Sequence, residues 1–149
     1  MNKRNIILIG MPGAGKSSVG VILAKVLGYE FIDTDLVIQH REKRLLREII
    51  ADEGNEGFLA IENEVNATLE ADKSVIAPGG SAIYGKEAME HFKEIGTIVY
   101  LKLSYEDLAK RLGNLKGRGV VLKEGQTLKD LYDERSKLYE QYAEITVDE

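Results

Sequence analysis

The sequence predicts an α/β domain with three layers, in which a mostly parallel five-stranded sheet is flanked by helices. Two observations predict this fold class. Short apolar runs that end at glycine or polar residues alternate with segments whose apolar residues recur at helical spacing. The 149 residues, of which 44% are apolar, are enough for one domain with a buried core. We therefore expect residues 1–149 to form a single domain.

The first strand, turn and helix lie at the N-terminus. Residues 5–10 (NIILIG) form a continuous apolar run, which is typical of a strand buried on both faces of a parallel sheet. A glycine-rich turn follows, and the apolar residues of 17–27 then recur at helical spacing. The short run YEFI at residues 29–32 predicts the second strand.

The next part of the chain has a mostly helical pattern. Residues 36–51 predict a charged helix, which Gly54 and Gly57 interrupt, and helical periodicity resumes over residues 58–71. A proline and two glycines then stop a short apolar run. The elements predicted here are a third strand, a helix and a fourth strand, at residues 74–77, 87–94 and 97–103.

Two capping signals mark the helices of the last third. Ser104 with Asp107 resembles a capping box that opens one helix. Thr127 with Asp130 opens the next helix, which runs to about Ala143. The remaining two segments are a mobile loop, rich in glycine and basic residues, and an edge strand, at residues 113–119 and 145–147.

The composition argues against several classes of protein. Lysine and arginine total 20 against 25 aspartate and glutamate, so no basic surface indicates a nucleic-acid partner. The lack of cysteine excludes disulfides, thiolate metal sites and cysteine nucleophiles. No run approaches the roughly 20 apolar residues of a membrane span, and the N-terminal apolar run is too short for a signal peptide. We expect a cytoplasmic protein without a membrane partner.

Residues 10–17 (GMPGAGKS) match the phosphate-binding pattern G-x-x-x-x-G-K-[ST] between a predicted strand and a predicted helix. The glycines let backbone N–H groups surround phosphates at the positive end of the helix dipole. Lys16 would reach the β and γ phosphates of ATP, and the Ser17 hydroxyl would ligate Mg²⁺. The alternative is an ordinary glycine turn with an incidental lysine. The nucleotide-binding residues predicted here are Gly13, Ala14, Gly15, Lys16, Ser17 and Ser18.

A phosphate-binding loop alone does not distinguish a motor, a switch and a kinase. Water-splitting ATPases usually carry an apolar strand that ends in an acidic residue, and neither SVIA nor TIVYLKL ends in one. A guanine-specifying N-K-x-D segment is also missing. Both observations favour a kinase.

Two aspartates, Asp33 and Asp35 (FIDTD), directly follow the second strand, at the edge of a parallel sheet where α/β sites form. Because the chain leaves the strand here, the two carboxylates can diverge. One can organise the hydration of Mg²⁺, and the other can face an acceptor hydroxyl as base or anchor. The alternative is that either aspartate caps the helix that follows.

With these motifs the sequence resembles the shikimate kinase family of small P-loop phosphotransferases along nearly its whole length. GMPGAGKSSVG resembles the family's Walker A segment, FIDTD its F-x-D-x-D motif, and GNEGFLAIE its G-E-x-x-F-R-x-x-E region. APGGSA resembles its three-glycine loop, RGVV its lid motif R-P-L-L, and ERSKLYEQYAEITVD its terminal motif. The resemblance implies the P-loop kinase fold, with an acceptor-binding lobe over about residues 34–62 and a mobile lid over about residues 112–124.

The resemblance also implies an ATP-dependent kinase that uses Mg²⁺ and phosphorylates a hydroxyl of a small carboxylate, first of all shikimate to shikimate 3-phosphate. Ser17 and Asp33 would handle Mg²⁺, directly and through water. Lys16 and Arg118 would neutralise the transferring phosphoryl group. Asp35 would engage the acceptor hydroxyl.

Four further roles follow from the resemblance. Gly79 and Gly80 would offer backbone N–H groups to the acceptor, and Arg135 would grip its carboxylate. Arg111 would lie against adenine. Each has a structural alternative, because two glycines can form a simple turn and arginines in charged helices are usually solvated.

One departure from the family pattern concerns the acceptor site. Leu59 stands where the family has a second carboxylate-binding arginine, although the glutamate that pairs with that arginine remains as Glu62. Losing one charge-assisted contact removes about 1.5–3 kcal/mol of binding free energy. The acceptor pocket is therefore expected to be both more acidic and more apolar than in the family.

Three interpretations of the acceptor follow. Shikimate binds through Arg135, alone or helped by the arginines of residues 41–47. Alternatively, the acceptor is another hydroxylated metabolite whose amine meets Glu62, such as homoserine. In the third interpretation the chain is a nucleotide-binding module without efficient phosphotransfer.

Milder departures concern the lid and the end of the chain. Gly119 replaces the lid proline, which is expected to increase the freedom of the lid. The chain ends at Glu149, where the family continues into a final helix, so we expect a less closed adenine pocket. No heptad pattern indicates a helical partner, and we expect a monomer.

Overall fold

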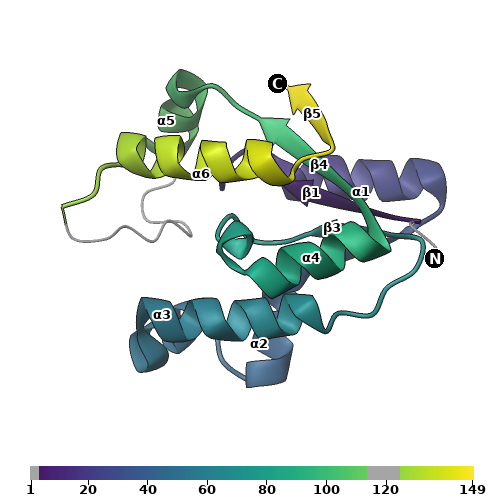
Figure 1. Cartoon of the computed structure of the whole chain (residues 1–149), viewed down its shortest axis with the longest axis horizontal. Helices are drawn as coiled ribbons and strands as arrows, with labels where there is room; N and C mark the ends of the chain where they lie inside the picture. The colour runs from purple at the N-terminus through teal and green to yellow at the C-terminus, as the bar shows by residue number, and fades with distance from the viewer. Residues whose placement is uncertain (1–3, 114–124) are drawn as a thin grey trace.

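A five-stranded sheet forms the centre of the structure, a computed structural model that describes residues 4–113 and 125–149 (Figure 1). Its strands stand in the order β2-β3-β1-β4-β5, and within the described residues every pairing of neighbours is parallel. The predicted sheet is therefore confirmed. The strands are β1 (Asn5–Ile9), β2 (Glu30–Asp33), β3 (Ser74–Ala77), β4 (Gly96–Lys102) and β5 (Ile145–Asp148).

Helices cover both faces of this sheet, which makes the three predicted layers. Successive side chains of a strand point to opposite faces. Ile7 and Ile9 of β1 accordingly pack in a cluster with α4 and α6, whereas Leu8 packs in a second cluster with α1. The helices are α1 (Lys16–Leu27), α2 (Thr34–Glu42), α3 (Leu46–Ala67), the 3-10 helix η1 (Ala82–Tyr84), α4 (Lys86–Ile95), α5 (Tyr105–Gly113) and α6 (Leu128–Tyr142).

The helices α2 and α3 form a lobe beside α4, at one side of the sheet (Figure 1). We call it the α2–α3 lobe. It has a small core of its own, in which each buried apolar side chain contributes about 1.5–3 kcal/mol of stability. The buried members of this core are Ile38, Ile49, Phe58 and Val65.

The boundaries of these helices differ from the predicted ones. The single helix expected over residues 36–51 is wrong, because Lys43 adopts the left-handed conformation (φ 56°) and ends α2. The interruption expected at Gly54 is present as a kink within α3 (φ 75°). The helix then ends at Ala67 instead of residue 71. No glycine marks this first break, because the left-handed position is occupied by a lysine, for which that conformation is uncommon.

Two sequence-based expectations concern the lid and membrane-spanning helices. The expected lid over residues 112–124 lies outside the described residues except for the end of α5, and Arg118 lies outside them too. Within residues 4–113 and 125–149, no helix has both the length and the apolar character needed to cross a membrane.

Candidate active site

The phosphate-binding loop connects the end of β1 to the start of α1, as the sequence predicts. Gly13 (φ 91°) and Gly15 (φ 82°) hold left-handed conformations that side chains disfavour. The first turn of α1 has no side-chain cap, which leaves backbone N–H groups and the positive end of the helix dipole to an anion. Ser17 and Ser18 are exposed in that turn.

Lys16 folds back over this loop. Its Nζ donates to the carbonyl oxygen of Gly10 at 2.8 Å and to that of Met11 at 2.9 Å. Burial lowers the pKa of Lys16 to about 8, although the nearby Asp35 carboxylate opposes the shift. The ammonium group therefore stands in the loop without a tight carboxylate partner among the described residues, ready for phosphate oxygens.

Arg111 lies against the other side of the loop. It extends from α5, and its Nη1 donates to the carbonyl oxygen of Gly13 at 2.7 Å. Its side chain is 47% exposed. This position beside the loop agrees with a role near the nucleotide, while contact with adenine stays a prediction.

Asp33 has the structural role that the sequence left open. It caps α2, because its Oδ1 accepts from the backbone N–H of Asp35 at 2.9 Å. The cap leaves Oδ2 for another partner. Mg²⁺ usually keeps several waters and binds one or two protein ligands together with phosphate oxygens. The Asp33 carboxylate and the Ser17 hydroxyl fit such a site, and the described residues contain no cluster of three metal-binding side chains that would favour another metal.

The sheet register brings Asp35 to Gly79. Asp33 of β2 pairs with Ala77 of β3. Asp35 and Gly79, each two residues further along, therefore lie at the same edge of the sheet. A Cβ atom on Gly79 would stand 2.9 Å from Asp35 Oδ1 and 3.1 Å from Glu62 Oε2. A side chain at this position would displace the Asp35 carboxylate, and two carboxylate oxygens face the same point.

The next residue, Gly80, faces a cation instead. A Cβ atom on it would stand 2.9 Å from Arg135 Nη1 and 2.8 Å from Pro12 Cδ in the phosphate-binding loop. The Tyr139 hydroxyl donates to the Gly80 carbonyl oxygen at 2.7 Å, within the core. The two glycines thus separate an acidic side of the site from a basic side, beside the loop.

Arg135 is a buried arginine, not a solvated one. Only 2% of the residue is exposed, and its guanidinium lies over the Tyr84 ring at 5.6 Å from the centroid. Its Nε and Nη1 have no hydrogen-bond partner among the described residues. Buried polar groups are nearly always paired in native proteins, so these donors indicate a place for an anionic ligand such as a carboxylate.

Glu62 lies on the acidic side, in α3. It is 2% exposed, and its Oε1 accepts from the Ser81 hydroxyl at 2.7 Å. Burial raises the pKa of Glu62 to about 7. Burial and the neighbouring Asp33 carboxylate raise the pKa of Asp35 to about 6, against the opposing effect of Lys16.

The sequence did not single out two residues that shape this site, Tyr84, which stacks on Arg135, and Tyr139, which holds the Gly80 carbonyl. Ser81, which replaces the third glycine of the loop APGGSA, binds Glu62. A signal existed for Tyr139, because it follows Arg135 by four residues in α6 and must share its helix face.

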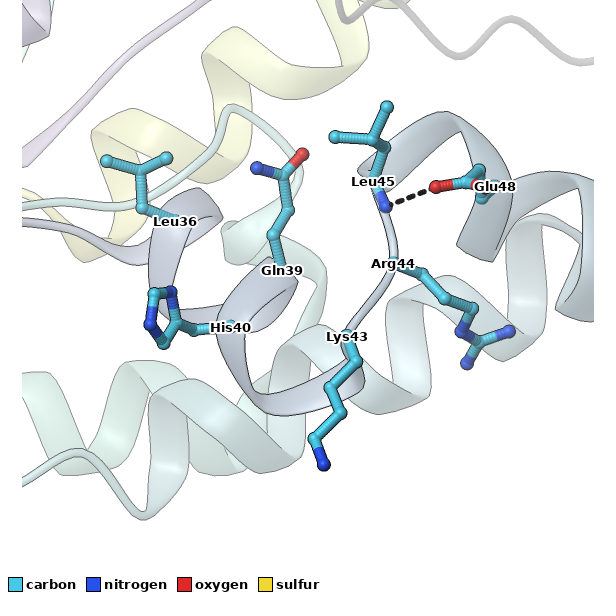
Figure 2. A pocket seen from close by; sticks show the side chains of 7 residues that line it. All are labelled: Leu36, Gln39, His40, Lys43, Arg44, Leu45 and Glu48. Carbon is cyan, nitrogen blue, oxygen red and sulfur yellow. Dashed lines mark hydrogen bonds between the residues drawn. The ribbon is translucent and has the colours of Figure 1, made fainter.

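Two of the neighbouring arginines, Arg41 and Arg44, have partners elsewhere. Arg41 pairs with Glu64 at 2.7 Å, and Arg44 bonds acidic residues of α2 and α3 at the surface. Arg44 also lines a hollow of about 280 Å³ between α2 and α3, shown in Figure 2. Its lining includes none of the residues that meet at Gly79 and Gly80. Leu59 lies half-buried against the core of the α2–α3 lobe.

Replacing Glu62 with glutamine is expected to stabilise the protein at pH 8 more than at pH 5. The folded protein holds on Glu62 a proton with a pKa of about 7 that the unfolded chain releases near 4.5. Wild-type stability therefore falls as pH rises between these values, by about 2–3 kcal/mol from pH 5 to 8. Urea denaturation at both pH values measures the difference. The exposed Glu64→Gln is the control, and an equal effect of Glu62→Gln at both pH values would contradict the prediction.

Sequence similarity to known proteins covers nearly the whole chain. A family model described as shikimate kinase matches residues 12–149. Shikimate kinase 2 of Yersinia enterocolitica is 34% identical over 154 aligned residues, which cover 97% of this chain and 86% of that protein. Shikimate kinase 2 of Yersinia pseudotuberculosis is 33% identical over the same shares.

Solved structures of shikimate kinases are also similar to this chain. A shikimate kinase from Acinetobacter baumannii in complex with shikimate superposes with a TM-score of 0.86 at 35% identity, over 97% of this chain and 83% of that one. The shikimate kinase of Aquifex aeolicus gives 0.77 at 32% identity, over 97% and 85%. A sugar kinase from Janibacter shares the fold alone, with a TM-score of 0.58 at 16% identity.

Proposed function

The chain belongs to the shikimate kinase family and is an ATP-dependent small-molecule kinase; on this premise we propose that it transfers the γ-phosphoryl group of ATP to a hydroxyl of a small carboxylate, with shikimate as the first candidate. One observation supports the acceptor class most. The buried guanidinium of Arg135, with two unpartnered nitrogens, lies across the Gly79–Gly80 turn from Asp35. A hydroxy acid seated there meets a cation at one end and a carboxylate at the other.

Each group at the site has a task in such a transfer. Lys16 and the first turn of α1 bind the phosphates and neutralise charge, since phosphoryl transfer needs positioning more than covalent help. The acceptor hydroxyl donates to Asp35, which is mostly ionised at pH 7 with its pKa of about 6. Mg²⁺, held by Ser17 and Asp33, would supply further charge neutralisation. Arg118, from outside the described residues, is proposed to assist at the transferring group.

The buried carboxylate of Glu62 favours a second candidate acceptor, one that carries an amine. Glu62 has a buried oxygen, Oε2, without a partner among the described residues. An amine on the acceptor would pair with it, as in a hydroxy-amino acid such as homoserine. The remaining interpretation, a nucleotide-binding module without phosphotransfer, is less well supported, because two buried nitrogens of Arg135 beside the loop lack hydrogen-bond partners among the described residues and so suit an acceptor carboxylate.

An acceptor screen tests the proposal. Wild-type protein with Mg²⁺ and ATP is expected to release ADP faster when shikimate or homoserine is added, measured in a coupled assay. Arg135→Met is expected to raise the acceptor KM roughly tenfold to a hundredfold with an unchanged KM for ATP, because one charge-assisted contact is lost. Arg41→Met, at an exposed ion pair, is the control. Flat background hydrolysis with every hydroxy acid would indicate the nucleotide-binding module instead.

A further inference from the structure

One carboxylate oxygen in the site lacks a partner. Glu62 Oε1 accepts from Ser81, but Oε2 has no hydrogen-bond partner within residues 4–113 and 125–149. The residue is 2% exposed, so bulk water does not satisfy this oxygen. A buried, unpaired acceptor costs free energy, and native proteins retain one where a ligand completes it.

The geometry points this oxygen at the acceptor. Glu62 Oε2 and Asp35 Oδ1 stand 3.1 and 2.9 Å from the same point above Gly79, so they are at most about 6 Å apart. The adjacent Gly80 faces Arg135. A single small molecule seated on the two glycines therefore reaches both carboxylates and the guanidinium.

Within the part of the chain that the structure describes, no cation forms an ion pair with Glu62. Arg135 is close enough to lower the pKa of Glu62 slightly, yet burial outweighs it, and no ion pair joins the two residues among those described. Ser81 contributes one hydroxyl, which already serves Oε1. Among the described residues the remaining oxygen, Oε2, has no donor, so it is open to a hydrogen-bond donor that arrives with the ligand.

We propose, as an extension of the function proposed above, that Glu62 determines acceptor specificity by binding a second hydrogen-bond donor of the acceptor, next to the hydroxyl that faces Asp35. The acceptor class is thus a carboxylate that carries two donors. The second donor is either another hydroxyl or an ammonium group, and both satisfy Oε2. Glu62 is a binding residue in this scheme and takes no part in the transfer itself.

Two matched pairs of acceptors separate these sources. Shikimate is compared with 4-deoxyshikimate, which lacks the neighbouring hydroxyl, and homoserine is compared with 4-hydroxybutanoate, which lacks the amine. KM is measured for each acceptor with wild type, Glu62→Gln and Glu62→Met, and melting temperatures verify folding. Glu64→Gln, an exposed position in the same helix, is the control.

We expect that, for one of the two acceptor pairs, the wild-type KM differs between the two compounds, and that this difference is lost in the Glu62 variants. A hydroxyl partner is worth roughly two- to tenfold in KM and is lost in Glu62→Met. An ammonium partner is worth roughly tenfold to a hundredfold and is already lost in Glu62→Gln, which keeps the shape and removes the charge. The KM for ATP stays unchanged in every variant.

Other outcomes overturn the inference in distinguishable ways. If wild type phosphorylates shikimate or homoserine but the KM ratio within its pair is the same in the Glu62 variants, the inference fails and the proposed function stands. If wild type binds Mg²⁺ and ATP but phosphorylates none of the four compounds, the proposed function fails and the inference with it.

Discussion

Lys16→Met is expected to reduce phosphoryl transfer by roughly a thousandfold or more, because the variant lacks the partly buried cation that neutralises the transferring group. The ammonium group stands in the phosphate-binding loop, where its Nζ donates hydrogen bonds to two carbonyl oxygens of that loop. Its pKa of about 8 leaves it mostly charged at pH 7, and bound phosphates favour the charged form further. Methionine preserves the length of the side chain and removes the charge.

The fold of Lys16→Met is expected to persist, since the variant buries an apolar group where a charge was desolvated. Circular dichroism and thermal melting verify this, and the coupled ADP assay with saturating acceptor measures transfer. Lys25→Met, at an exposed position near the other end of α1, is the control and should keep full activity. Retained activity in the folded Lys16→Met variant would refute the role of the loop.

Asp35→Asn is expected to lower kcat by roughly a hundredfold to ten-thousandfold, the usual range for a general base or an essential hydroxyl anchor. Asparagine has nearly the same shape and fits beside Gly79, but it cannot take a proton. Affinity for ATP should change little, because the loop and α1 bind the phosphates. Rapid-quench measurement of transfer, with separate calorimetry of ATP binding in the presence of Mg²⁺, tests both statements.

The pH dependence of the wild-type kcat tests the same role of Asp35. Burial and Asp33 raise the pKa of Asp35 to about 6. The ionised carboxylate is therefore lost as pH falls through 6, and kcat should fall with it. Asp52→Asn, at an exposed residue of α3, should keep the wild-type profile. A tenfold loss of ATP affinity in Asp35→Asn with normal kcat would contradict the assignment.

The nucleotide side of the site was predictable because it is local. A buried strand, a glycine turn and a helix start are consecutive in the sequence, and their geometry follows from backbone conformation and the helix dipole. The structure places Lys16 and Ser17 where the motif puts them. The parallel sheet was predictable for a similar reason, since each strand and helix carries its own hydrophobic period.

The sequence was less informative where tertiary packing acts against local preference. Nothing in the pattern of residues 36–51 indicates that Lys43 takes a left-handed conformation and divides the helix. Without the family resemblance, the residue pattern makes Arg135 one more charge on a polar helix, yet only 2% of the residue is exposed. Packing against Tyr84 and the Gly80 loop decides its burial, and residues far apart in sequence supply those contacts.

The sequence by itself determined the phosphate-binding loop, the alternation of strands and helices, and the kinase family, because each depends on short-range spacing or on the order of motifs. The family resemblance implied acceptor roles for Asp35 and Arg135, but only the tertiary structure decided how the side chains of the acceptor site meet. Asp35, Glu62 and Arg135 come from three separate helices and meet at Gly79 and Gly80 through the register of β2 and β3 and the packing of α6. Such convergence depends on long-range packing, which no local pattern encodes.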